Sequence, residues 1–160
     1  MYKRILVPLD GSKLAEQILS HVKTIAKATG GKAILARAVP KHAEFLLEAP
    51  SETKKWMKEA EARAARYLEG VAKGLEKAGV KTQVEVLPGE PAAQILTAAE
   101  RENVDLVAMM SHGETGLSAF ERGSVAEKVL KHSPRPVLMV RAFRTQVRLL
   151  HEGEVWSLKR

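Results

Sequence analysis

The segment Val104–Gly113 reads VDLVAMMSHG, an apolar run that ends in serine, histidine and glycine. Every residue from Leu106 to Met110 is apolar. A continuous run of this kind is typical of a strand buried on both faces of a parallel sheet. Because it is the most apolar strand that the sequence predicts, we expect it to be central in its sheet.

Outward from this strand, the spacing of apolar residues alternates between that of strands and that of helices. The sequence predicts strands over 5–7, 33–39, 82–87, 104–110 and 136–140, and helices over 12–30, 51–79, 91–99 and 124–132. Ser12 is placed to cap the first helix, and Gly30 to end it. Strands separated by helices predict a three-layer α/β/α fold around an open parallel sheet, with right-handed crossovers.

The 160 residues suit a single folded unit, since domains mostly run to roughly 100–200 residues. We place that unit at residues 1–141 and treat 142–160 as a C-terminal extension. The extension carries six large apolar side chains, too many for a solvated tail: Phe143, Val147, Leu149, Leu150, Val155 and Trp156.

Composition excludes several classes of protein. The chain has no Cys, which rules out disulfides, Cys-ligated zinc, iron–sulfur clusters and thiol nucleophiles, and which fits a reducing compartment. No apolar run approaches the roughly 20 residues of a membrane-spanning helix. The N-terminal MYKRILVP lacks the apolar core of a signal peptide. We therefore expect a cytoplasmic protein with no membrane partner.

The charge balance is basic, with Lys+Arg 26, Asp+Glu 19 and a formal net charge of +7. The basic residues are interleaved with acidic ones, however, as in the stretch 52–61, which indicates a solvated helix face. Aromatic residues make up only 4% of the chain, too few for a platform on which bases stack. Nucleic acid is therefore not expected as the main partner.

Two predicted strand ends carry polar residues suited to a ligand site. The first strand ends in PLDGS (residues 8–12), and the fourth ends in SHGETG (residues 111–116). In an open α/β sheet, ligands bind beyond the carboxyl ends of the strands, near the switch in strand order. If these two strands are neighbours, the loops meet, and their glycines let backbone N–H groups approach phosphate oxygens.

Each polar residue in these loops has a structural alternative. Asp10 accepts hydrogen bonds either from ribose hydroxyls or within its own turn. His112 is either an acid, base or phosphate donor, or a hydrogen-bonded loop residue. Gly113, Gly123 and Ser124 serve either a phosphate cradle or the geometry of a loop and a helix cap. The residue types alone leave these alternatives open.

Three established motifs are missing. The chain contains neither G-x-x-x-x-G-K-[ST] nor G-x-G-x-x-G. A triad of Ser12 or Ser111 with His112 and Asp10 lacks the G-x-S-x-G turn on which such a nucleophile sits. The histidines are scattered without metal-ligand spacing, so no metal centre is expected.

Taken together, several segments resemble the universal stress protein family, of the adenine nucleotide α-hydrolase-like superfamily. They are ILVPLDGS (5–12), GEPA (89–92), VDLVAMMSHG (104–113), GSVAEKVL (123–130) and PVLMVR (136–141). The resemblance covers about residues 2–141. It implies a Rossmann-like five-stranded parallel sheet in the order 3-2-1-4-5, with helices on both faces.

The family's nucleotide-binding pattern, G-x2-G-x9-G-[ST], is matched in part. Gly113 is followed by nine residues and then by Gly123 and Ser124, but Met110 stands where the first glycine of the pattern falls. A side chain at this position either crowds the path of the ribose and phosphates or packs under the loop.

The resemblance implies ATP or a related adenine nucleotide as ligand, with Mg²⁺ as its counter-ion. By position, Pro8 and Asp10 would meet adenine and ribose, and the backbone of Ala38 the adenine edge. The implied residues around the phosphates are Ser111, His112, Gly113, Gly123, Ser124 and Val125. Met110 belongs to the same implied nucleotide site.

The family divides into members that bind ATP and members that lack nucleotide, so two functions stay open. One is a stress-response protein that uses the nucleotide as ligand or switch. The other is a signalling module that acts through dimerisation and protein contacts. The phosphate loops hold no Lys, and Arg122 is their nearest cation, so we expect at most slow ATP hydrolysis.

Members of the family are commonly homodimers joined along the fifth strand. Residues 136–141 form an otherwise exposed sheet edge, and the apolar extension 142–160 would cover that edge or cross to the partner.

Overall fold

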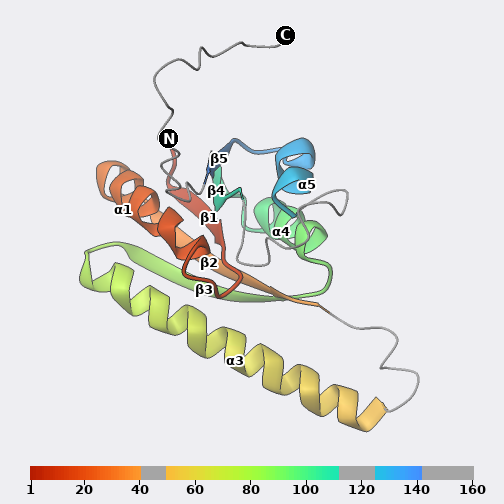
Figure 1. The fold of residues 1–160 in the computed structure, drawn as a ribbon. Coiled ribbons are helices and arrows are strands. Elements are labelled where there is room, and N and C mark those ends of the chain that lie inside the picture. Colours follow the sequence, from red (N-terminus) through yellow and green to blue (C-terminus); the bar gives the residue numbers. More distant parts are fainter. Residues whose placement is uncertain (41–49, 112–124, 142–160) are drawn as a thin grey trace, which may run out of the picture.

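Five parallel strands form one sheet in the order β3-β2-β1-β4-β5 (Figure 1). The computed structural model describes residues 1–40, 50–111 and 125–141. Within these residues the strands are β1 (Arg4–Pro8), β2 (Lys32–Val39), β3 (Lys81–Pro88), β4 (Leu106–Met110) and β5 (Val137–Val140). The predicted fold class and strand order are confirmed.

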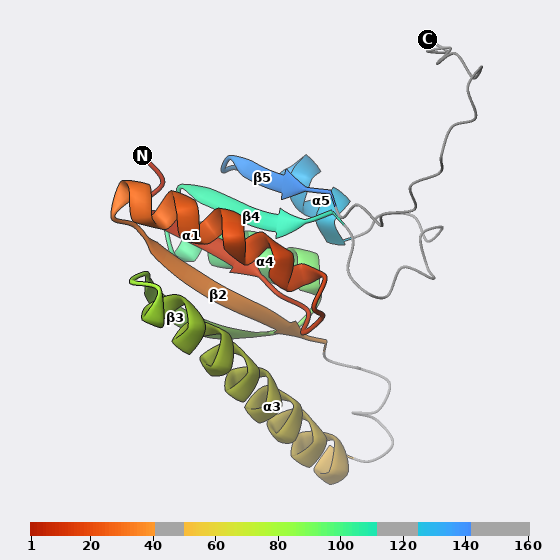
Figure 2. The same cartoon turned by 60° about the vertical axis from the view of Figure 1, so that its left-hand side comes forward.

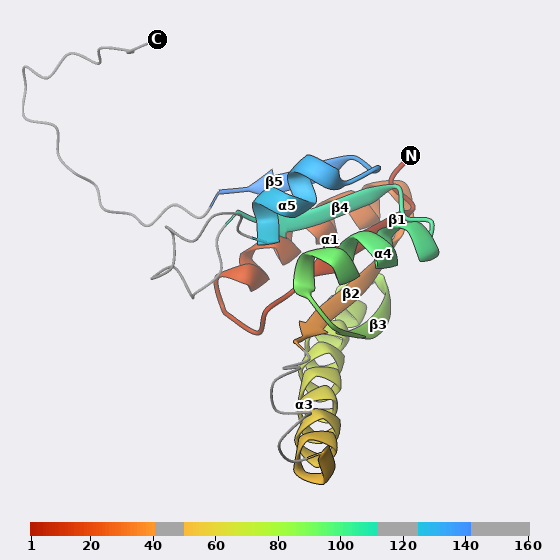
Figure 3. The same ribbon diagram turned by 90° about the vertical axis from the view of Figure 1, so that its right-hand side faces the viewer.

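Helices cover both faces of this sheet, as Figure 3 shows. They are the 3-10 helix η1 (Ala15–Gln17) and the α-helices α1 (Ile18–Thr29), α3 (Pro50–Lys77), α4 (Pro91–Arg101) and α5 (Val125–His132). Buried residues of α1 and α3 share one core with the sheet, and those of α4 and α5 share another. We call these two sides the α1/α3 face and the α4/α5 face.

The apolar run at 106–110 forms an interior strand. All five residues of β4 are buried, and the strand pairs with β1 on one side and β5 on the other. The middle position belongs to β1, which lies between β2 and β4, so the expectation that the most apolar strand is central was wrong by one strand. Val104 lies outside β4 because its N–H donates to the Ala99 carbonyl at the end of α4.

The first predicted helix is interrupted near its start. Ser12 Oγ accepts a hydrogen bond from the Ala15 N–H at 3.0 Å, so Ser12 caps the turn that leads into the short helix η1, whose own N-cap residue Leu14 makes no side-chain cap. The α-helix proper then begins at Ile18 and buries Ile18, Val22 and Ala26. It ends at Gly30, whose φ of 63° is the left-handed conformation that glycine adopts without steric cost.

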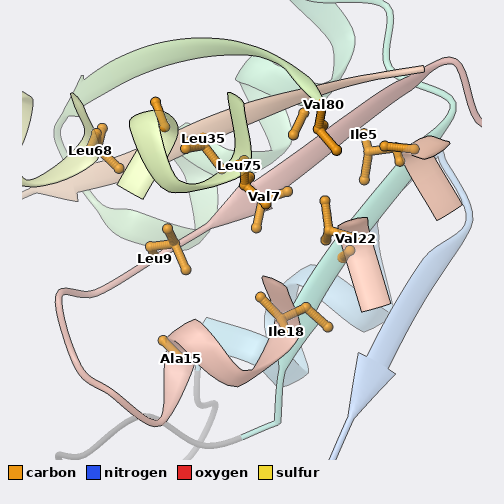
Figure 4. Packing of buried hydrophobic residues seen from close by; sticks show 14 of the residues in the cluster. Ile5, Val7, Leu9, Ala15, Ile18, Val22, Leu35, Leu68, Leu75 and Val80 are labelled. Carbon is orange, nitrogen blue, oxygen red and sulfur yellow. The ribbon is translucent and has the colours of Figure 1, made fainter. Parts of the chain in front are cut away.

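The long helix α3 packs on β2 and β3 with its C-terminal half, where Leu68, Ala72 and Leu75 are buried. Its N-terminal half extends past the carboxyl ends of the strands (Figure 2). In the core on this face, Ile18 and Val22 of α1 lie against Val7 and Ile5 of β1 (Figure 4). None of the helices within the described ranges is both long and apolar enough to cross a membrane.

Candidate functional site

The carboxyl ends of β1, β2 and β4 lie side by side in the middle of the sheet. Leu6 is level with Val107 across the β1–β4 pair, and Pro8 with Ala36 across the β1–β2 pair. The Leu9 N–H extends this ladder by donating to the Ala36 carbonyl at 2.8 Å. The adjacency of the first and fourth strands, on which the predicted site depends, is therefore confirmed.

Beyond β1 the chain makes a tight turn around Asp10. The Ser12 N–H donates to Asp10 Oδ1 at 2.8 Å, and Gly11 between them has a φ of 93°. The turn role of Asp10 and the cap role of Ser12 are thus both present. Asp10 is exposed, and a carboxylate accepts up to about four hydrogen bonds. Its part in the turn therefore leaves capacity for a ligand hydroxyl.

Strand alternation divides the candidate residues between the two faces of the sheet. Val7 and Leu9 belong to the core of the α1/α3 face, so Pro8 between them lies on the α4/α5 face. Ala38 and Val125 pack against the core of the α4/α5 face. The strand ends and α5 therefore bring these three residues to the same side of the sheet.

Met110 lies on the other side. Its side chain is 6% exposed and belongs to the α1/α3 core, which also contains Leu9, Ala15 and Ile18. Since a methionine fills space in a core with its flexible thioether, this side chain packs beneath the strand end. The neighbouring Met109, equally buried, belongs to the α4/α5 core.

Ser111 follows β4 and is held there by its N–H, which donates to the Val140 carbonyl at 2.9 Å. It lies at the same edge of the sheet as Asp10 and Met110. The remaining predicted site residues, His112, Gly113, Gly123 and Ser124, lie outside the described residues.

A capped helix stands at the same edge of the sheet. Glu90 accepts a hydrogen bond from the Ala93 N–H at 2.7 Å, with Pro91 in the first turn of α4. That bond, followed by the nearby Lys128 ammonium at 3.2 Å, lowers the pKa of Glu90. Because Lys128 belongs to α5, Glu90 also joins the two helices of the α4/α5 face.

Sequence reasoning missed a group of residues behind the Asp10 turn. The Arg37 guanidinium of β2 lies over the Tyr67 ring of α3, 5.1 Å from its centroid. The Tyr67 hydroxyl donates to Glu16 Oε1 at 3.1 Å. Local patterns carry no signal for this group, because these side chains are separated by tens of positions in the chain.

Comparison with known proteins gives a consistent result. The model of the Universal stress protein family matches residues 1–141. Universal stress protein MJ0577 of Methanocaldococcus jannaschii is 36% identical over 158 residues, covering 88% of this chain and 96% of that protein. A solved structure of MJ0577 superposes with a TM-score of 0.79 at 34% identity, covering 91% of this chain and 99% of the other.

Two other solved structures carry an adenine nucleotide. A universal stress protein in complex with cAMP is similar with a TM-score of 0.59 at 21% identity, covering 88% of this chain and 97% of its own. The Arabidopsis thaliana family protein At3g01520 with AMP bound has a TM-score of 0.63 at 17% identity, covering 89% and 93%. At these identities the two structures share the fold with this chain.

Proposed function

The chain belongs to the universal stress protein family, and we propose that it binds ATP or a related adenine nucleotide as a ligand or switch. The proposed site is the carboxyl edge of β1, β2 and β4. Relatives of the same fold are bound to cAMP and to AMP. We also propose that the protein acts in the cytoplasm, in keeping with its lack of Cys.

The observation that carries this proposal is the grouping of Pro8 and Ala38 on one face of the sheet beside the exposed Asp10 carboxylate. Apolar groups from two neighbouring strands suit the flat face of a purine, and a carboxylate at the strand end suits a ribose hydroxyl pair. In this arrangement Pro8 and Asp10 meet adenine and ribose, and the Ala38 backbone meets the adenine edge.

The position of Met110 supports the same proposal. A side chain that obstructed the nucleotide would have to share the face of Pro8 and Ala38. The Met110 side chain instead belongs to the core beneath the opposite face. This favours a nucleotide-binding protein over a module with a blocked pocket.

For the phosphates we propose the loop after β4 and the amino end of α5. A helix amino end carries partial positive charge and exposed N–H groups, and Val125 begins that helix. The proposed phosphate site is completed by Ser111, His112, Gly113, Gly123 and Ser124, and Mg²⁺ would accompany ATP there as its counter-ion.

We propose that the protein binds ATP as a ligand and hydrolyses it at most slowly. Comparing single-turnover rates of the wild type and His112→Ala tests whether this loop contributes to any hydrolysis.

We further propose a homodimer joined along β5, with residues 142–160 packing on that edge. The strand lies at the end of the sheet, and all four of its apolar residues are only half-buried. An uncovered edge strand of this kind offers its backbone groups to a second chain.

Calorimetric titration with ATP and Mg²⁺ tests the binding proposal. The wild type should bind, and Asp10→Asn should bind about tenfold more weakly, because the amide keeps the turn but loses a charged acceptor for ribose. Glu100→Gln, an exposed glutamate on α4, is the matched control and should bind as the wild type does. Absence of binding by the wild type at millimolar ATP would instead support the protein-contact module.

A further inference from the structure

The turn between β1 and η1 contacts the side chain of Arg37 from the neighbouring strand β2. A Cβ built on Gly11 would lie 2.9 Å from Arg37 Cζ and Nη1 and 3.0 Å from Nη2. The guanidinium plane therefore lies directly against the backbone at Gly11. Gly11 has a φ of 93°, a left-handed conformation that glycine adopts without strain, and a Cβ there would displace the guanidinium.

Arg37 is itself held from the other side by α3. Its guanidinium stacks over Tyr67 at 5.1 Å from the ring centroid, a cation–π distance. The Tyr67 hydroxyl donates to Glu16 of η1, whose second oxygen pairs with Lys13 at 2.8 Å. Burial, and then the Glu16 carboxylate, raise the pKa of Tyr67, so the phenol stays protonated and remains a donor. The group links β2, α3 and η1.

Arg37 and Tyr67 lie on the face of the sheet opposite to the proposed ligand. Arg37 lies between Ala36 and Ala38 on β2, both of which pack toward the α4/α5 core. By strand alternation Arg37 points to the α1/α3 face, where Tyr67 is also packed. Arg37 therefore contacts the turn from behind, on the side opposite to Pro8 and Ala38.

We propose that Arg37, clamped on Tyr67, is a positioning residue that holds the Asp10–Ser12 turn in the conformation that binds the nucleotide. This inference rests on the proposed function, and deepens it by coupling α3 to ligand affinity. Arg37 acts through the backbone of Gly11 and the orientation of the Asp10 carboxylate. It makes no contact with the phosphates.

The first test needs no ligand. Hydrogen exchange of the Ser12 amide, which donates to Asp10 Oδ1, reports how firmly the turn is held. Arg37→Gln should speed this exchange by about fivefold, the equivalent of one ordinary hydrogen bond, while amides in the buried strand β4 keep their rates. Arg66→Gln removes the same charge from an exposed position next to Tyr67 and should leave the Ser12 amide unchanged.

The second test measures affinity in a double-mutant cycle. Arg37→Gln should weaken the binding of adenosine and the binding of ATP by the same factor, about fivefold. In an Asp10→Ala background the same substitution should change affinity by less than about twofold, because its effect runs through Asp10. Tyr67→Leu should reproduce Arg37→Gln, whereas Tyr67→Phe, which keeps the ring under the guanidinium, should retain most of the affinity.

The outcomes separate the two proposals. If the wild type binds no adenine nucleotide but Arg37→Gln speeds Ser12 exchange, the proposed function fails while the clamp on the turn stands. If Arg37→Gln leaves Ser12 exchange unchanged, or weakens ATP far more than adenosine, the positioning role is overturned. The second of these results would place Arg37 at the phosphates instead.

Discussion

Met110 is the residue at which this chain departs from the nucleotide-binding pattern of its family. The pattern has a glycine there, and a glycine at the end of a strand is readily explained by a ligand that approaches the backbone. In this chain the methionine side chain is turned into the α1/α3 core and is 6% exposed. The substitution therefore changes the core on one face and leaves the other face to the proposed ligand.

This arrangement predicts that Met110→Ala affects stability and spares binding. Removing the buried thioether should lower the free energy of unfolding by about 2–4 kcal/mol, measured by urea denaturation. The ATP dissociation constant from calorimetry should stay within about twofold. Met109→Ala, an equally buried methionine on the α4/α5 face, is the matched comparison and should weaken ATP binding more. A large gain of affinity in Met110→Ala would identify the side chain as a block.

Two glycines offer an opposite pair of predictions. A Cβ on Gly31 would lie 2.7 Å from the Tyr2 carbonyl oxygen, and the backbone there cannot easily move away. Gly31→Ala should therefore lower the free energy of unfolding by about 1–3 kcal/mol. A Cβ on Gly70, on the exposed side of α3, has nothing within 4 Å. Gly70→Ala should therefore raise stability by about 0.5–1 kcal/mol, since alanine favours the helix. Thermal unfolding followed by circular dichroism checks both, and equal effects would contradict the predicted packing.

At the scale of the element, the start of α4 shows how one side chain organises a helix. Glu90 satisfies the Ala93 N–H and pairs with Lys128 of α5. Its carboxylate thus stabilises the first turn of α4 and the contact between the two helices of the proposed ligand face.

The lowered pKa of Glu90 gives this cap a pH dependence. A folded pKa below the ordinary value of 4.5 means that the stabilisation is fully present above pH 4.5 and is lost as the pH falls through the folded pKa. At pH 7, Glu90→Gln should reduce the free energy of unfolding by about 0.5–1 kcal/mol. The difference should shrink as the pH falls through the folded pKa, because the wild-type side chain then becomes neutral as well. Denaturant unfolding across this pH range measures the effect, with Glu100→Gln as the control. A difference between the wild type and Glu90→Gln that did not change with pH would contradict the role of the Glu90 carboxylate as a cap.

The elements were largely predictable from the spacing of apolar residues, because burial on one helix stripe or on both strand faces leaves a period in the sequence. The run 106–110 and the helix stripe that includes Ile18 and Val22 are of this kind. Which strand stands in the middle was not predictable from apolarity, since β1 and β4 are both flanked by strands and both buried.

The candidate site was predictable where it depends on strand ends and turns. Asp10 in its turn and Ser12 as a cap follow from local chemistry. The clamp of Arg37 on Gly11 and Tyr67 depends on contacts between distant parts of the chain, which no local pattern encodes. His112, Gly113, Gly123 and Ser124 lie outside the described residues and stay predictions.

At the scale of the whole molecule, β5 lies at the edge of the sheet, and we propose this edge as the place where a second chain binds. Val137, Leu138, Met139 and Val140 are all half-buried, and Leu130 of the adjacent α5 is 54% exposed. The carbonyls of Pro136 and Val140 accept hydrogen bonds from the β4 side. In a parallel strand the alternate residue, Met139, then directs its N–H outward, away from β4.

This geometry predicts that Met139→Pro converts a dimer to a monomer. Proline removes the outward N–H while leaving the pairing of β5 with β4 in place. Met139→Leu keeps both the N–H and the side-chain volume and should stay dimeric. Sedimentation analysis measures the oligomeric state of the two variants and the wild type. A dimer that persists in Met139→Pro would show that pairing along β5 does not hold the dimer together.

We propose that an adenine nucleotide binds at the carboxyl edge of β1, β2 and β4, and an amide-resolved NMR titration with ATP and Mg²⁺ can locate its binding site residue by residue. Binding there predicts saturable shifts of the amides of Asp10, Ser12, Ala38 and Ser111, with the amides at the C-terminal end of α3, just before the start of β3, unaffected. Saturable shifts confined to other surfaces, or no saturable shift at millimolar ATP, would contradict it.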